Sequence, residues 1–264
     1  MLAPLLVTTS DRTDSALSAR ARAAAAEVPV PFVERHHKLP LSRLLREQAR
    51  ALVVFEAAAV SLVDGEGSLR FSPGLAHLRI KQLDAGVAED MLVTHARLAP
   101  GETVLDCTLG LGGDAQVAAR LVGRAGRVVA LERSPALFLL VKHGLAGLAP
   151  HPASAALEVR HADASAFLAA TPSGSFDVVL LDPMFERPQK SSAAFEMVRR
   201  HAERAGLTAA TLREAQRVAR RAVVLKGSRY SSDFRKLGVA AAPARPSAKV
   251  LWAVLPGSAP PGGD

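Results

Sequence analysis

A short apolar run that ends abruptly in Asp182-Pro183-Met184-Phe185 limits what this chain can fold into more than any other segment. The run covers residues 176–181 and reads Phe-Asp-Val-Val-Leu-Leu, which is typical of a strand buried inside a parallel sheet. Ligands of open α/β sheets bind at the carboxyl ends of such strands. The sequence therefore predicts that a carboxylate, a rigid turn and an aromatic ring emerge together at a ligand-binding edge.

Three residues at this strand end, Asp182, Pro183 and Phe185, suit an exocyclic amine of a nucleobase. Such an amine is a poor nucleophile because its lone pair is delocalised into the ring. The carboxylate of Asp182 and the carbonyl of Pro183 could accept its two hydrogens while Phe185 stacks on the base. Asp-Pro can also simply end a strand, and a phenylalanine is more often part of a core. The combination nevertheless favours methyl transfer to a base nitrogen, with Asp182, Pro183 and Phe185 as catalytic candidates.

Strands and helices alternate around this motif in the order of a doubly wound sheet. We expect strands at residues 103–105, 127–131, 157–160, 176–181, 222–226 and 250–254, separated by helices at 114–122, 135–148, 164–169, 192–205 and 208–220. The opening residues carry a strand–helix–strand pattern of their own, with Asp14 as a helix cap. We predict an α/β, Rossmann-like fold with a small N-terminal α/β accessory domain at 1–75, a main domain at 76–256 and a disordered Gly/Pro-rich tail at 257–264.

A glycine-rich segment follows the first strand of the main domain and opens a helix. It reads Asp-Cys-Thr-Leu-Gly-Leu-Gly-Gly-Asp from 106 to 114, and Gly110 and Gly112 would let the backbone pass close to a nucleoside. Glu132 closes the next strand 20 residues after Gly112, the spacing of the acid that binds ribose hydroxyls. Asp163, after the third strand, is placed for an adenine amine.

Two cofactors compete for this segment. Gly110-x-Gly112-x-x-Ala115 also satisfies the dinucleotide fingerprint, so the segment alone leaves NAD open. Asp106 is suited to holding the ammonium of S-adenosylmethionine (SAM) indirectly, and hydride transfer has no evident need for the Asp182 motif. Both observations favour SAM.

Positive charge is concentrated after the Asp-Pro-Met-Phe motif. Residues 186–236 hold 13 Lys/Arg and 5 Asp/Glu, whereas residues 86–185 hold 7 and 10. Such an excess favours a polyanion, and we take Lys190, Arg199 and Arg200 as candidate RNA contacts. The alternative interpretation is an arginine-rich helix face that is merely solvated.

Three of these segments carry a family resemblance. Residues 106–115, Leu131-Glu132-Arg133, and Asp182 to Phe185 with Gln189-Lys190-Ser191 resemble the class I SAM-dependent methyltransferases. More narrowly, they are similar to the family of the small-subunit rRNA guanine-N2 methyltransferase J. The resemblance covers about residues 100–226, departs at Gly113, where the family has a basic residue, and over residues 1–75 points to a less characterised branch. It implies cofactor contacts from Gly113, Asp114, Glu132, Arg133, Asp163, Ala164 and Asp182.

These observations predict a cytoplasmic SAM-dependent N-methyltransferase acting on a base in RNA, with guanine N2 of 16S rRNA as the target. A DNA adenine-N6 or small-molecule methyltransferase stays open, as does a non-catalytic RNA-binding or ribosome assembly factor. The single cysteine, Cys107, excludes an internal disulfide and fits a reducing cytoplasm. The histidines lack partner ligands at metal spacing, and no apolar stretch approaches the ~20 residues that span a bilayer. We therefore expect neither a metal nor a membrane partner.

Overall fold

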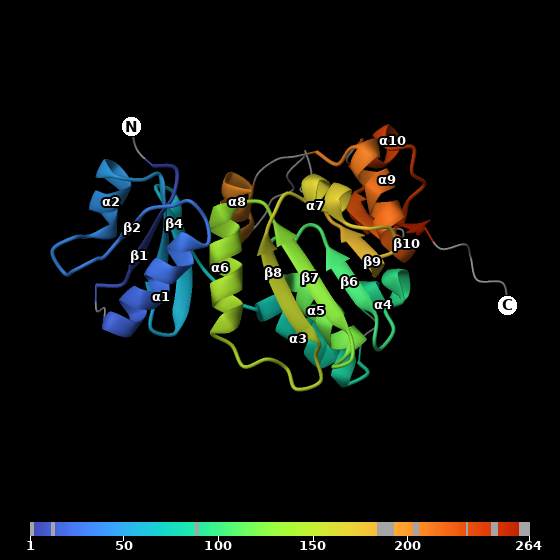
Figure 1. The fold of residues 1–264 in the computed structure, drawn as a ribbon, viewed down its shortest axis with the longest axis horizontal. Coiled ribbons are helices and arrows are strands. Elements are labelled where there is room, and N and C mark those ends of the chain that lie inside the picture. The colour runs from blue at the N-terminus through green and yellow to red at the C-terminus, as the bar shows by residue number, and fades with distance from the viewer. Residues whose placement is uncertain are drawn as a thin grey trace. The chain divides into compact units, whose positions relative to one another are not determined.

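The computed structural model describes residues 3–11, 14–87, 90–183, 193–202, 206–230, 232–243 and 248–258. The chain divides into two compact units, each with its own sheet (Figure 1). The first unit contains Met1–Ser72, Ser134–Ala149 and Ser191–Ala202. The second contains Pro73–Arg133, Pro150–Lys190 and Glu203–Asp264. The predicted α/β class is confirmed, because helices pack on a largely parallel sheet in the larger unit and on a mixed sheet in the smaller one.

The first unit is built on a sheet of order β2-β1-β3-β4-β5. Its strands are β1 (Leu6–Thr9), β2 (Phe32–Val33), β3 (Ala51–Glu56), β4 (Ala59–Asp64) and β5 (Gly67–Arg70). The helices assigned to it are α1 (Ser15–Ala26), α2 (Leu41–Glu47), α6 (Pro135–Ala146) and α8 (Ala193–His201). Helix α1 begins where the sequence predicts, because Asp14 Oδ1 accepts the N–H of Leu17 at 2.7 Å. Strand β5 was not predicted, since its mostly exposed residues lack an apolar alternation.

Helix α6 is bound to the first unit by close packing. It contacts β3 and β4, and its buried Gly144 lies against the side chain of Phe71, the residue after β5. The ring of His143 meets the ring of Phe55 edge to face, with centroids 5.2 Å apart. Lys142 Nζ lies 2.6 Å from Glu27 Oε2. Apolar packing and an ion pair therefore both hold α6 in this unit.

Replacing Gly144 by alanine is expected to destabilise the protein, although alanine normally favours a helix interior. The new Cβ would lie 2.2 Å from Phe71 Cγ, so the ring would have to move. We expect a loss of about 1–3 kcal/mol in the free energy of unfolding, as for other overpacked cores, measurable by urea denaturation. Gly147→Ala is the matched control, because its Cβ would meet nothing closer than 3.5 Å. Equal effects of the two substitutions would contradict the packing argument.

The second unit contains a seven-stranded sheet of order β11-β12-β10-β9-β6-β7-β8. The strands are β6 (Thr103–Asp106), β7 (Arg127–Glu132), β8 (Ala156–His161), β9 (Phe176–Leu181), β10 (Ala219–Ser228), β11 (Ala242–Pro243) and β12 (Val250–Pro256). Strand β12 runs antiparallel to both of its neighbours, and the remaining strands share one direction. The six strands predicted by the sequence for this sheet are all present, and β11 is added.

Helices cover both faces of this sheet. They are α3 (Gly74–Asp84), α4 (Met91–Ala96), α5 (Gly113–Val122), α7 (Ala164–Ala170), α9 (Ala209–Val218) and α10 (Asp233–Lys236). The crossover β6–α5–β7 runs along the sheet in the direction opposite to β9–α9–β10, and right-handed crossovers then place α5 and α9 on opposite faces. Helices α3 and α4 pack on α5, whereas α7 packs on α9 (Figure 1). The predicted doubly wound arrangement is thus observed.

The reversal of direction falls between β6 and β9, which pair in parallel register from Val104↔Val178 to Asp106↔Leu180. The chain leaves these two strand ends toward opposite sides, and this is where open α/β sheets form their ligand crevice. Cys107 N–H continues the ladder by donating to Leu180 O at 3.0 Å. The Asp106 and Asp182 ends of the two strands are therefore neighbours.

Asp177 is the charged residue inside the apolar run of β9. Its hydrogen-bond partners lie near the amino ends of the neighbouring strands, opposite to the end that carries Asp182. Its Oδ2 accepts the N–H and the hydroxyl of Thr103, both at 2.8 Å, and its Oδ1 accepts Arg220 Nε at 2.8 Å. The hydrogen bond from Arg220 is the main cause that lowers the pKa of Asp177 to about 2. This carboxylate fastens the start of β9 to β6 and β10, away from the crevice.

The last described residues of the chain are hydrogen-bonded to β10. Gly257 and Ser258 donate backbone hydrogen bonds to Arg221 O and Ala219 O, and the remaining residues of the expected tail, 259–264, lie outside the described residues. Over the described ranges, no helix has both the length and the apolar character needed to cross a bilayer. Over the same ranges, no three His, Cys, Asp or Glu side chains gather in a way that could hold a metal ion.

Candidate active site

The glycine loop after β6 has the backbone that a nucleoside-binding turn requires. Gly110 and Gly112 have φ angles of 54° and 76°, a region that favours glycine, and Gly112 caps the start of α5. A Cβ at Gly110 would meet nothing closer than Thr108 O at 3.9 Å, so the space beside the loop is open. Gly110 N–H donates to Glu132 Oε2 at 3.2 Å. The acid at the end of β7 therefore lies directly beside the loop.

Thr108 joins the glycine loop to the end of β9. Its hydroxyl oxygen accepts the N–H of Asp182 at 2.7 Å, while its own N–H donates to Asp106 Oδ1 at 2.9 Å. The glycine loop and the end of β9 are therefore neighbours. The side chain of Asp182 keeps 31% of its surface accessible, which leaves it within reach of a ligand.

Asp182 is the first residue in a series of ion pairs in which carboxylates and cations alternate. Lys226 Nζ lies 2.6 Å from Asp182 Oδ2 and 3.0 Å from Asp114 Oδ2. Arg79 Nη1 lies 2.6 Å from the other oxygen of Asp114, and Arg79 also binds Asp90 through two bonds of 2.6 and 2.9 Å. The five residues come from or border α3, α4, α5, β9 and β10, so the site draws on much of the second unit.

Carboxylates outnumber cations in this cluster. Burial raises the pKa of Asp106 to about 7, and the nearby Asp114 and Asp182 act in the same direction. Burial also raises the pKa of Asp182, against the opposing attraction of Lys226. For Asp114 the cations outweigh burial, and its pKa is lowered. Asp90, Asp114 and Asp182 face the two cations, and Asp106 adds a carboxyl group that is partly protonated near pH 7, so the balance favours a ligand that brings positive charge.

The ends of β7 and β8 supply the rest of the predicted cofactor residues. Arg133 Nη1 lies 3.5 Å from Asp163 Oδ2, and Asp163 Oδ1 caps α7 by accepting the N–H of Ala166 at 2.9 Å. Ala164 is the first residue of α7. His161 Nε2 lies 2.9 Å from the backbone oxygen of Arg133, which gives this histidine a structural partner. The structure places Asp106, Gly110, Gly112, Gly113, Asp114, Glu132, Arg133, Asp163, Ala164 and Asp182 along one edge of the sheet.

Of the predicted substrate residues, some lie outside the described residues and others lie on α8 of the first unit. Phe185 and Lys190 lie outside the described residues, and Pro183 is the last described residue after β9. Arg199 and Arg200 lie on α8 in the first unit, where Arg199 pairs with Glu196 at 2.8 Å. Arg200 pairs with Asp64 at 2.9 Å and with Glu66 at 3.2 Å. Carboxylates of the protein therefore compensate the charge of both arginines.

This pairing extends to most of the basic segment. Ten of its Lys/Arg residues lie in the described part of 186–236, and six of them pair with carboxylates: Arg199, Arg200, Arg217, Arg220, Arg221 and Lys226. Charge that is clustered along the sequence is thus largely neutralised in space. The observation favours the alternative interpretation, in which these arginines stabilise the fold.

Sequence reasoning missed Arg79, Asp90, Thr108 and Lys226 as residues of the site. Arg79 precedes its partner Asp114 by 35 residues, and no local pattern indicates such a pair. Lys226 did carry a signal, because it is the first polar residue after the apolar run 222–225. Leu225 pairs with Leu181, which puts Lys226 beside Asp182 at the same edge.

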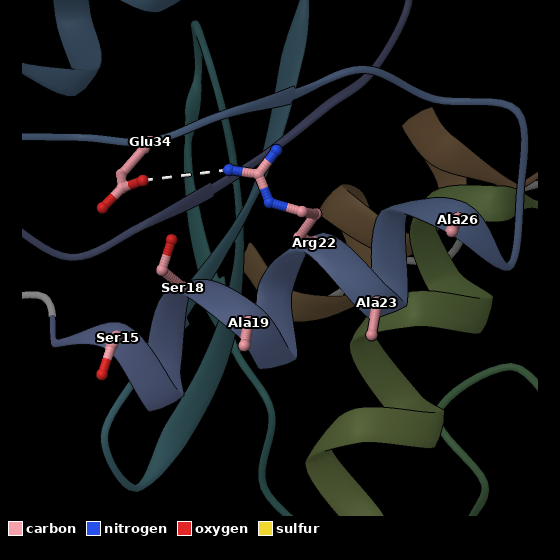
Figure 2. A pocket seen from close by; sticks show the side chains of 7 residues that line it. All are labelled: Ser15, Ser18, Ala19, Arg22, Ala23, Ala26 and Glu34. Carbon is pink, nitrogen blue, oxygen red and sulfur yellow. Dashed lines mark ion pairs between the residues drawn. The ribbon is translucent and has the colours of Figure 1, made fainter.

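A concave surface lies in the first unit. A groove of about 560 Å³ runs along α1, and Figure 2 shows the residues that line it: Ser15, Ser18, Ala19, Arg22, Ala23, Ala26 and Glu34. Arg22 and Glu34 face each other across it at 3.9 Å. Small side chains and one long ion pair form this groove, in contrast to the buried carboxylates and glycine turn of the second unit. We therefore place the active site at the sheet edge.

Comparison with known proteins identifies the family of this chain. Residues 45–242, three quarters of the chain, match the family described as "Putative SAM-dependent methyltransferase". The chain is 34% identical to the uncharacterized protein YpiP of Bacillus subtilis, over 88% of this chain and 92% of that protein. It is 34% identical to ribosomal RNA small subunit methyltransferase J of Coxiella burnetii, over 60% of this chain and 64% of the relative.

The fold agrees as well. A SAM-dependent methyltransferase from Neisseria gonorrhoeae has a similar structure, with a TM-score of 0.56 and 23% identity over 98% of this chain and 97% of that one. The glycine turn, the strand-end acid beside it and the excess of carboxylates fit SAM, which carries a ribose and two cationic groups. The chain therefore belongs to the SAM-dependent methyltransferase family that includes ribosomal RNA small subunit methyltransferase J.

Proposed function

We propose that this methyltransferase modifies an exocyclic amine of a nucleobase in RNA, and that its target is guanine N2 of 16S rRNA. The observation that carries the proposal is the hydrogen bond between Asp182 N–H and Thr108 Oγ1 at 2.7 Å, which fixes the amine-binding strand end against the cofactor loop. Methyl transfer needs such proximity, because holding donor and acceptor in line supplies much of the rate enhancement.

The cofactor side of the proposal uses the edge residues of β6, β7 and β8. The glycine loop with Asp106 and Asp114 would hold the methionine part, Glu132 the ribose hydroxyls, and Asp163 with Ala164 and Arg133 the adenine. When bound, SAM supplies an electrophilic methyl group on a sulfonium. The negative balance of the cluster around Asp182 supports binding of that cation.

The acceptor side uses Asp182, Pro183 and Phe185. Asp182 and the carbonyl of Pro183 accept the two hydrogens of the amine, which turns the nitrogen lone pair toward the methyl group, and Phe185 stacks on the extruded base. With SAM bound, the new N–C bond would form as the S–C bond breaks, and S-adenosylhomocysteine would leave. The nitrogen would be cationic after this step and would release its proton to water, so no strong base is required.

Support for RNA as the substrate comes from the relatives. Those named ribosomal RNA small subunit methyltransferase J match 34–60% of this chain, including one from Laribacter hongkongensis that is 45% identical over 95 residues. The sequence motifs resemble the guanine-N2 enzyme of that name. Phosphate contacts would come from Lys190 together with Arg199 and Arg200, whose ion pairs would have to be exchanged for phosphate.

The test is mass-spectrometric mapping of 16S rRNA from cells with and without the gene, backed by transfer of tritiated methyl groups in vitro. We expect one N2-methylguanosine to disappear in the deletion strain and to be restored by the purified protein. Label appearing in DNA or metabolites instead would replace RNA as the substrate class. Tight rRNA binding without any incorporated label would indicate a ribosome assembly factor and overturn the proposal.

A further inference from the structure

We propose that Lys226 is a positioning residue for methyl transfer, which holds Asp182 by one carboxylate oxygen and presents the other oxygen to the acceptor amine. This inference rests on the proposed role of Asp182 and adds a residue to it. Lys226 Nζ is bonded to Asp182 Oδ2 at 2.6 Å. Among the described residues, Oδ1 of Asp182 has no hydrogen-bond partner. It is therefore the oxygen that can receive a hydrogen from the amine.

The sheet fixes Lys226 in this place. Its strand β10 pairs with β9 on one side and with β12 on the other, where Lys226 is opposite Trp252. The ammonium lies 5.6 Å from the centroid of the Trp252 ring, at cation–π distance. Two carboxylates and an aromatic ring therefore surround the cation, and only 23% of its side chain is exposed. This confinement distinguishes it from a mobile surface lysine.

Trp252 is itself immobilised. Its ring stacks on His95 of α4 with 4.9 Å between centroids and 6° between planes, and the tryptophan is 7% exposed. Burial lowers the pKa of His95, so the imidazole is neutral near pH 7 and does not repel the ammonium. The stack of His95, Trp252 and Lys226 thus supports Asp182 from the side of the sheet that carries α4.

Lys226 also bridges the cofactor helix to the acceptor strand. Its second bond, 3.0 Å to Asp114 Oδ2, reaches the first turn of α5, which follows the glycine loop. Binding of SAM against that loop and binding of the base against Asp182 therefore share one cation. A residue in this position sets the direction of the acceptor carboxylate relative to the methyl donor.

Lys226 also affects the pH at which Asp182 ionises, together with the other charged groups that face this carboxylate. The charged groups that face Asp182 are Asp106 of β6, Asp114 of α5, Lys226 of β10 and Arg79 of α3, which reaches Asp114. Burial raises the pKa of Asp182, and the attraction of Lys226 is the largest opposing contribution. Without the ammonium, two carboxyl groups would remain as the nearest charges. Asp182 would then stay protonated at higher pH, and a protonated oxygen cannot accept the amine hydrogen as well.

The experiment compares Lys226→Met, Lys226→Gln and Lys226→Arg with the wild type. We expect Lys226→Met to lower kcat about 100-fold at pH 7, as for loss of a preorganised charged group, with KM for RNA nearly unchanged. Part of kcat should return at high pH, because the acid limb of its pH profile moves upward. Lys226→Arg should restore most of kcat by keeping the charge. Lys249→Met, an exposed lysine, is the matched control and should behave as wild type.

A second readout does not depend on turnover. The pKa of the Asp182 carboxyl can be followed by carbon NMR in the wild type and in Lys226→Gln, with Asp182→Asn to assign the signal. We expect the substitution to raise this pKa by at least about one unit, a tenfold change in the proton equilibrium. Lys226→Gln keeps a donor beside Asp182, so it serves if Lys226→Met does not fold, which thermal unfolding would show.

The outcomes separate the two proposals. If the wild type methylates no RNA, the proposed function fails, while the NMR titration still decides whether Lys226 controls the protonation of Asp182. If the wild type methylates rRNA but Lys226→Gln has an unchanged kcat, pH profile and Asp182 pKa, the positioning role is overturned. Equal losses in Lys226→Arg and Lys226→Met would also overturn it, because the role depends on the positive charge.

Discussion

Asp182→Asn should lower kcat for methyl transfer about 1,000-fold while leaving S-adenosylhomocysteine bound within a few-fold of the wild-type Kd. The amide has nearly the shape of the carboxylate, but it presents two N–H donors where the acceptor amine needs an oxygen. It also removes the charge that Lys226 Nζ binds at 2.6 Å. Losses of this size are typical when a group that orients the reacting atoms is removed.

Single-turnover methylation of the natural RNA, combined with calorimetry of the product cofactor, measures both quantities. Asp177→Asn is the matched control because it changes the same residue type at the other end of β9, where Asp177 pairs with Arg220 and Thr103. The control should unfold at lower denaturant near pH 7 and retain its kcat. The stability lost by this control should vanish as the pH falls through about 2, where the wild-type carboxylate is itself protonated. Full turnover by Asp182→Asn would remove Asp182 from the mechanism.

Glu132→Ala should weaken cofactor binding about 100-fold and affect kcat little once the cofactor is saturating. Glu132 is proposed to accept the ribose hydroxyls, and a hydrogen bond to a charged group contributes about 1.5–3 kcal/mol. The substitution also removes the acceptor for Gly110 N–H, at 3.2 Å, which helps to shape the loop. Binding is thus lost through both the ligand contact and the preorganised turn.

Calorimetry with S-adenosylhomocysteine tests this directly, and NADH in the same cell tests the dinucleotide alternative. Glu158→Gln is a suitable control, since Glu158 lies on the edge strand β8 and pairs with Arg127 and Arg160. We expect wild-type affinity from the control and no NADH binding by either protein. An unchanged Kd in Glu132→Ala would exclude the ribose role.

The parts of the fold that the sequence predicted are those with a strong apolar period. Each buried strand of the second sheet was visible as an apolar run, and the rule that ligands bind at the carboxyl ends of parallel strands then predicted a binding role for Asp182. Strand β11 and helix α10 were not predicted because they are only two and four residues long. Periodicity needs several repeats before it distinguishes a strand from a loop.

Only the part of the candidate site that lies in local sequence motifs could be predicted. The residues proposed to bind the cofactor lie in local motifs, whereas Arg79 and Lys226 reach Asp114 across 35 and 112 residues. The basic segment shows the same limit, because its linear charge gave no hint that Asp64 would meet Arg200 or that Glu102 would meet Arg221. Net charge along a chain does not reveal which charges are compensated in space.

The assignment of α6 and α8 to the first unit has a consequence for how the protein must be built. The polypeptide passes between the two units five times, and the passage at 133–134 comes just after Glu132. Truncation at residue 75 would strip α6, with its buried Leu137, Leu139 and Leu140, of the sheet it packs on. Each unit is assembled from three separated segments of the chain, so no single cut in the polypeptide releases either of them intact.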